Sequence, residues 1–104
     1  MAQEYIRPTT AVAPWTSYHI EGPTTTTTDA FVSFTYSVTY DGINILVEDN
    51  AALIEFRNID GATWMGEIAL PKGYFYIGQQ FTGARIKNRA AGQNITFQLV
   101  AGTV

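Results

Sequence analysis

The chain has 104 residues, of which 46% are hydrophobic, 13% aromatic and only 14% charged, and its formal net charge is −3. This length is typical of one domain with one core, and the composition is that of a folded chain, which excludes two domains and extensive disorder. The sequence contains no cysteine, so a disulfide framework and a thiolate metal cluster are excluded as well.

The first residues do not combine a basic region with an apolar stretch, and no run approaches 18 apolar residues. We therefore expect neither a signal peptide nor a transmembrane segment. The lack of cysteine favours a reducing compartment such as the cytoplasm, and it also fits a particle that is assembled there and released later.

The charges are divided unevenly along the chain. Residues 1–52 carry one basic and six acidic side chains, whereas residues 53–104 carry five basic and three acidic ones. The net acidic half of one copy can attract the net basic half of another copy. An uneven distribution by chance explains the same pattern, and both interpretations stay open.

Residues 1–29 are predicted to form an extended N-terminal arm followed by a threonine-rich loop. Prolines at positions 8, 14 and 23 oppose regular pairing. The arm contains isolated apolar residues, namely Tyr5, Ile6, Trp15, Tyr18 and Ile20. We expect one strand near residues 15–20, and we favour a loop over a strand for the threonine run 24–28. The β-domain is then expected over residues 30–104.

Residues 31–40 alternate aromatic or β-branched side chains with serine and threonine, which predicts a strand with one buried face. The Asp41-Gly42 step that follows is a hairpin signal, so we expect this strand to pair with the next one, over 43–47. Further strands are predicted over 52–57, 63–70, 74–77, 82–88 and 94–101, with the last two forming a closing hairpin. A helix is expected at most as one short turn within 49–53.

Turn signals recur about every eight to twelve residues from position 41 onward, which is typical of a sandwich or barrel. The fold class is therefore predicted to be all-β: a single antiparallel β-sandwich, jelly-roll-like, with about eight strands and an extended N-terminal arm.

The most specific group of polar residues is Arg85-Ile-Lys-Asn-Arg89. In a strand, Arg85, Lys87 and Arg89 project to one face about 6.8 Å apart, while Ile86 points to the core. Such a row can dock onto an acidic patch of a neighbouring subunit. Alternatively, it is a solvated strand face whose charges block edge-to-edge pairing. With a sequence pI near 4.8, nucleic acid is not an expected partner.

No catalytic set is apparent, so we expect no enzymatic activity, no cofactor and no bound metal. The single histidine, His19, lies on a predicted strand, and no serine occupies a nucleophile elbow. The carboxylates of Glu48 with Asp49, or Glu55 with Glu67, have no spacing that demands glycoside hydrolysis. The segments 41–44 and 48–50 are better explained as turns than as calcium loops.

The aromatic residues Trp15, Trp64, Tyr74 and Tyr76 are mostly expected in the core, although together they are able to form a sugar-stacking platform. Trp15 is the exception because it lies in the arm. An arm with spaced apolar residues, Tyr5, Ile6 and Trp15, can bind to a neighbouring copy.

The arm over 1–22, the strand over 31–40, the segment Gly73-Tyr-Phe-Tyr-Ile-Gly78 and the closing hairpin over 84–101 together resemble the small jelly-roll and β-sandwich structural proteins of tailed-bacteriophage particles. These include decoration or cement proteins, head-fibre bases and tail tips. The resemblance spans most of the chain but rests on no diagnostic motif.

This resemblance implies a non-enzymatic structural subunit of a virion, of the capsid decoration or cement type. We expect it to assemble in the host cytoplasm, to form a homotrimer, and to dock on other virion proteins such as a major capsid protein. Arg85, Lys87, Arg89, Tyr5, Ile6 and Trp15 are the expected contact residues. The alternative is a carbohydrate- or receptor-binding module of a tail or fibre tip, with host glycans as partners.

Overall fold

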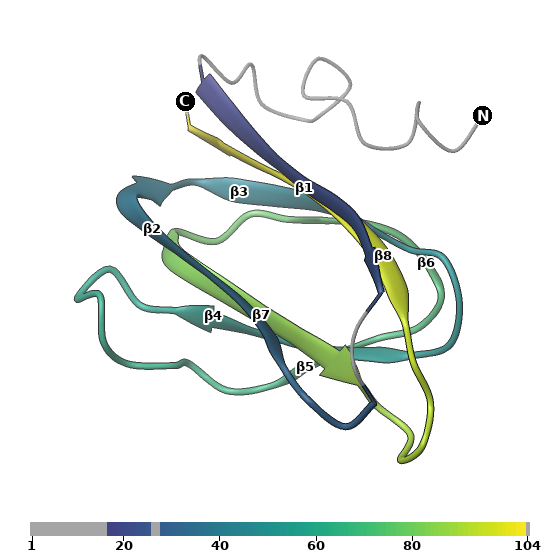
Figure 1. Ribbon diagram of the computed structural model, residues 1–104. Coiled ribbons are helices and arrows are strands. Elements are labelled where there is room, and N and C mark those ends of the chain that lie inside the picture. Colours follow the sequence, from purple (N-terminus) through teal and green to yellow (C-terminus); the bar gives the residue numbers. More distant parts are fainter. Residues whose placement is uncertain (1–16, 26–27, 104) are drawn as a thin grey trace.

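The computed structural model describes residues 17–25 and 28–103, and Figure 1 shows their arrangement. The described residues form eight β-strands: β1 (Ser17–Thr25), β2 (Val32–Tyr40), β3 (Gly42–Val47), β4 (Ala52–Arg57), β5 (Ile68–Leu70), β6 (Gly73–Ile77), β7 (Phe81–Asn88) and β8 (Thr96–Thr103). The part of the chain that is described contains no helix, and therefore no helix able to span a membrane.

The strands form two antiparallel four-stranded sheets that face each other (Figure 1). The first has the order β1-β8-β3-β6 and the second the order β2-β7-β4-β5. The pairing is nested, because β1 pairs with β8, β2 with β7, β3 with β6 and β4 with β5. This is the strand order of a jelly roll, so the predicted all-β sandwich of about eight strands is confirmed.

The core lies between the two sheets and is built from alternate residues of each strand. Ile43, Ile45 and Val47 of β3 in the first sheet, and Ile54 and Phe56 of β4 in the second, are all buried in this core. Further buried members are Phe81, Ala84, Ile86, Ile95, Phe97, Leu99 and Ala101. The period of two along each strand is the pattern expected for sheets with one buried face.

In β2 the predicted alternation fails only at Val38, because Tyr40 at the end of the strand is again buried in the core. Val32, Phe34 and Tyr36 pack against the core, but Val38 is exposed. The register of β2 against β7 shifts between Thr35 and Tyr40, which moves the residues between them out of the regular pairing.

The predicted hairpin at Asp41-Gly42 is wrong. Tyr40 pairs with Phe81 in the second sheet, whereas Gly42 already pairs with Gly102 in the first. The amide of Asp41 donates to the carbonyl of Gly102 at 2.8 Å. The chain therefore changes sheet within one residue, and the step forms a corner of the sandwich.

The predicted closing hairpin is wrong for the same reason. β7 ends where Asn88 pairs with Ala52 in the second sheet, and β8 begins in the first sheet. Residues 89–95 thus cross between the layers, and two strands adjacent in sequence do not pair with each other.

Two other segments differ from the sequence-based expectation. The strand expected over 63–70 is reduced to β5, because Gly66 has a φ of 102° and the Asp60 carboxylate accepts bonds from the amides of Ala62 and Thr63 to close a turn. No helical turn forms within 49–53, where Asn50 instead has a positive φ of 56°.

Residues 17–25, which lie within the expected arm, form a strand of the sandwich. Ser17 pairs with Thr103 and Thr25 with Thr96, so β1 is an edge strand of the first sheet. Two threonines of the run, Thr24 and Thr25, belong to this strand rather than to the expected loop. Residues 1–16 lie outside the described part of the chain.

Candidate functional site

Arg85 and Lys87 project from the outer face of the second sheet, as their alternation with buried Ile86 predicts. The strand that carries them, β7, lies between β2 and β4. It is therefore a central strand, and the alternative that these charges protect a sheet edge is wrong.

Arg85 is bound within its own sheet. Its Nε and Nη2 atoms donate to Oε1 of Glu55, on the neighbouring strand β4, at 3.0 and 2.6 Å. Its guanidinium also lies between two aromatic rings, 4.5 Å from the centre of Phe31 and 4.3 Å from that of Trp64. An ion pair and two cation–π contacts hold this side chain, so Arg85 stabilises the sheet rather than presenting a free charge.

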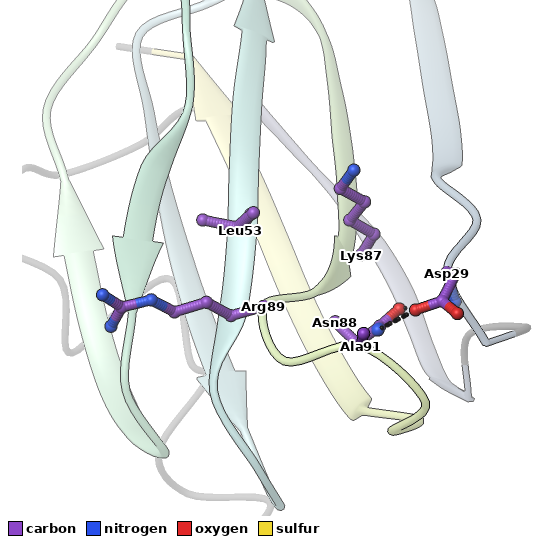
Figure 2. A pocket seen from close by; sticks show the side chains of 6 residues that line it. All are labelled: Asp29, Leu53, Lys87, Asn88, Arg89 and Ala91. Atoms are coloured by element: carbon purple, nitrogen blue, oxygen red, sulfur yellow. Dashed lines mark hydrogen bonds between the residues drawn. The ribbon is translucent and has the colours of Figure 1, made fainter.

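Lys87 and Arg89 form no ion pair within the described residues. The ammonium of Lys87 lies 4.7 Å from the centre of the Phe31 ring. Arg89 follows the end of β7, and its backbone amide still donates to the carbonyl of Ala51 at 2.9 Å. Figure 2 shows that the two side chains point in different directions, with Arg89 running past Leu53. The predicted row of three is therefore a pair of cations that diverge.

These two cations line a shallow pocket of about 190 Å³ at the end of the second sheet (Figure 2). Its lining residues are Asp29, Leu53, Lys87, Asn88, Arg89 and Ala91. Leu53 supplies apolar surface and the cations supply positive charge. A site of this composition can accept a carboxylate or another small anionic group.

One wall of the pocket is fixed by a reciprocal pair of hydrogen bonds between Asp29 and Asn88. The amide of Asp29 donates to Oδ1 of Asn88, and Nδ2 of Asn88 donates to Oδ1 of Asp29, both at 2.7 Å. The backbone amide of Gly92 adds a third bond to the same carboxylate oxygen, at 3.1 Å. The bond from Asn88, then that from Gly92, and more weakly the charge of Lys87, hold the pKa of Asp29 below its usual value. Asp29 therefore stays ionised as a fixed acceptor, and its negative charge partly offsets that of Lys87 in the pocket lining.

The sequence did not point to Asp29, Leu53, Asn88 or Glu55 as members of this region. The alternation places Glu55 on an outer face, but its proximity to Arg85 depends on β4 pairing with β7, which local periodicity does not reveal. Asp29 reaches Asn88 across 59 positions of sequence.

The remaining predicted contact residues, Tyr5, Ile6 and Trp15, lie outside the described residues. Of the aromatics considered for a sugar platform, Trp64 stacks on Arg85 over the second sheet. Tyr74 and Tyr76, in contrast, pair with Leu46 and Asn44 on the outer side of the first sheet. These three rings therefore do not form one platform, and glycan binding stays a prediction.

His19 lies near one open edge of the sandwich. Its Nε2 atom is 2.5 Å from Oε2 of Glu21, and its ring packs edge-on against Tyr36 with centroids 5.4 Å apart. Burial, with a smaller contribution from the charge of Glu21, raises the pKa of the Tyr36 phenol above its usual value. Among the described residues there is no group of three or more His, Cys, Asp or Glu side chains suited to hold a metal ion.

In comparisons with known proteins, no family model, no curated protein and no solved structure matches this chain.

Proposed function

We propose that the chain is a non-enzymatic structural subunit of a virus particle, of the capsid decoration or cement type that its sequence resembles. The observation that carries this proposal is the pair of cations, Lys87 and Arg89, at the pocket over Leu53. A jelly roll is an architecture shared by capsid domains and lectins, and the strand order supports the proposal to that extent.

In this proposal the outer face of the second sheet docks on an acidic side chain of a neighbouring subunit. Arg85 is already neutralised by Glu55, so it positions the aromatic rings of Phe31 and Trp64 instead of making the contact. Lys87 and Arg89 bring their charge to the neighbour, and the fixed wall formed by Asp29 and Asn88 limits how the incoming group is oriented.

The docking surface is tested by a charge substitution with a matched control. Lys87→Gln and Lys72→Gln change the net charge equally, but Lys72 lies in the exposed turn between β5 and β6, away from the pocket lining. We expect the purified chain to self-associate in sedimentation velocity, and Lys87→Gln to weaken association at low salt, where charge attraction is least screened. Lys72→Gln is expected to behave as the unmodified chain.

The particle itself gives the second test. In virus particles purified by density gradient from cells that carry the gene, mass spectrometry is expected to find the chain in stoichiometric amounts. Absence from such particles, or a monomer at every concentration and salt with both variants alike, would overturn the proposal.

A further inference from the structure

Strand β2 lies at an edge of the second sheet, and its open side has no partner strand among the described residues. The order of this sheet is β2-β7-β4-β5, so β2 pairs with β7 alone. On an edge strand, the N–H and C=O groups of alternate residues point away from the sheet, where another strand can bind them. The side chains of β2 therefore decide whether this edge attracts or repels a second chain.

The sequence of β2 lacks the residues that protect edge strands. Residues 31–40, Phe-Val-Ser-Phe-Thr-Tyr-Ser-Val-Thr-Tyr, include no charged residue, no proline and no glycine. Their aromatic and β-branched side chains have high β-propensity. An uncharged segment of this length and composition favours pairing between chains when it lies on an exposed edge.

The other three edge strands are each protected in a way that β2 is not. β5 has only three residues. β6 has five, and the first of them is Gly73 with a φ of 145°. β1 contains Glu21 and Pro23, and its register against β8 shifts between Glu21 and Thr24. Short strands, charges, prolines and bulges all oppose edge-to-edge pairing, so β2 is the edge that best suits another strand.

A register shift limits how much of this edge is regular. The pairing of β2 with β7 runs from Val32 to Thr35 and resumes only at Tyr40. A bulge bends the strand, so the residues after Thr35 do not continue a straight edge. An incoming strand is therefore expected to pair with the first half of β2, over about five residues or roughly 17 Å.

We propose that two copies of the chain pair through β2, antiparallel and around a twofold axis at Phe34. Opposed residues of an antiparallel pair point to the same face, so an even-numbered residue must lie opposite an even-numbered one. This axis places Ser33 of each copy opposite Thr35 of the other on the outer face, and the two Phe34 side chains opposite each other on the inner face. Hydroxyl and aromatic pairs of this kind stabilise antiparallel strands, and no charge opposes the contact, so the segment is complementary to itself.

The core of the sandwich is open at the same edge. Val32, Phe34 and Tyr36 point toward the core but are only partly buried, whereas the inward residues of the central strand β3 have 0% exposure. Phe34 packs edge-on against Phe97 of β8, with ring centroids 6.1 Å apart. A second Phe34 at the twofold axis extends this apolar contact into the neighbouring copy. The proposed interface thus joins the cores as well as the sheets.

This contact goes beyond the docking proposed above, because it uses the edge of the second sheet and not the pocket at Lys87 and Arg89. Backbone hydrogen bonds and apolar surface maintain it in salt, whereas attraction through the two cations weakens as the ionic strength rises. A twofold contact also gives an even number of copies, in contrast to the trimer expected from the sequence.

The interface is tested by charges of either sign on the outer face of β2. In Ser33→Lys/Thr35→Lys each new lysine lies opposite a lysine of the other copy, and in Ser33→Glu/Thr35→Glu each glutamate lies opposite a glutamate. We expect the unmodified chain to sediment as a dimer even in about 0.5 M salt. In about 0.1 M salt, each double variant is expected to raise the dissociation constant of the dimer about tenfold, because like charges face each other twice.

Mixing the two double variants at the lower salt concentration is expected to restore the dimer as a one-to-one pair, which native mass spectrometry identifies by its mass. Gln79→Lys/Gln80→Lys is the matched control, because it adds two positive charges to the exposed segment between β6 and β7. We expect the control to dimerise as the unmodified chain does. Far-UV circular dichroism checks that every variant is folded.

Three results would each overturn the inference. These are a monomer or a trimer as the only species of the unmodified chain in about 0.5 M salt, a dimer that neither double variant weakens, and a mixture in which unlike pairs are no more frequent than like pairs. A dimer that persists in high salt while Lys87→Gln has no effect at low salt supports the β2 contact and contradicts the docking at the pocket.

Discussion

Replacing Arg85 by glutamine separates a structural role of the basic residues from a docking role. The substitution leaves the Glu55 carboxylate, whose side chain is only 11% exposed, without its cation. Breaking a fully buried pair costs roughly 3–5 kcal/mol and an exposed one contributes roughly 0.2–1, so this partly buried pair is expected to cost about 2 kcal/mol. The two lost cation–π contacts add roughly 0.5–1 kcal/mol each.

The expected loss of unfolding free energy is therefore about 3 kcal/mol for Arg85→Gln, or roughly 12–24 °C in Tm for a domain of this size. Lys87→Gln removes one cation–π contact with Phe31 and is expected to cost about 0.5 kcal/mol. Urea unfolding followed by far-UV circular dichroism measures both, because the fluorescence of Trp64 itself changes when Arg85 is replaced.

A double-mutant cycle with Glu55→Gln isolates the pair. We expect a coupling energy of about 1–2 kcal/mol between positions 55 and 85, since their side chains are in direct contact. Equal stability of Arg85→Gln and Lys87→Gln, or additive effects in the cycle, would refute the assignment of Arg85 to the sheet.

Three further predictions concern the scaffold. Phe81→Ala, at a fully buried ring, is expected to cost about 3–5 kcal/mol in urea unfolding; a loss under about 1 would show that the core collapses around the site. Gly83→Ala places a Cβ 2.8 Å from the carbonyl oxygen of Phe34 in β2 and is expected to lower Tm. Gly78→Ala is the control, because its Cβ meets only ordinary contacts with the Tyr76 ring. Equal Tm values for the two variants would contradict this geometry. Asn88→Ala removes the main cause of the lowered pKa of Asp29, so that pKa, followed by NMR titration, is expected to rise toward its usual value. Because the pKa of Asp29 is lower in the folded chain than in the unfolded one, its stabilisation is complete above the unfolded pKa and is lost as the pH falls through the folded pKa. Asn88→Ala should therefore lose less stability in acid than the unmodified chain. An unchanged titration of Asp29 in the variant would contradict the assignment.

The fold class and most strands follow from local patterns in the sequence. β4 and β6 begin and end close to where the alternation predicts, because period-two burial is a local property that needs no knowledge of the partner strand. The Asp41-Gly42 step misleads because the same two residues make a hairpin or a corner between sheets, and only long-range pairing decides between these outcomes.

The candidate site was predictable only in part. The outward direction of Arg85 and Lys87 follows from alternation, and the structure places both on the outer face. The neutralisation of Arg85 depends on Glu55 from a strand paired across the sheet, and Arg89 diverges because β7 ends at Asn88. Such contacts join distant parts of the chain, which residue spacing does not encode.

The nested pairing of the strands also determines the order in which the sandwich can form during synthesis. Of the four nested pairs, β4 and β5 are the nearest in sequence, because only residues 58–67 separate them. The partner of β3 is β6, that of β2 is β7 and that of β1 is β8, so each of these strands is synthesised well before its partner. The last strand to be made is β8. A ribosome adds roughly 5–20 residues per second, so the early strands stay unpaired for seconds with apolar side chains accessible. During synthesis the strand pairs therefore become available from the middle of the chain outward, and β1, the first described strand to be made, is the last to gain its partner.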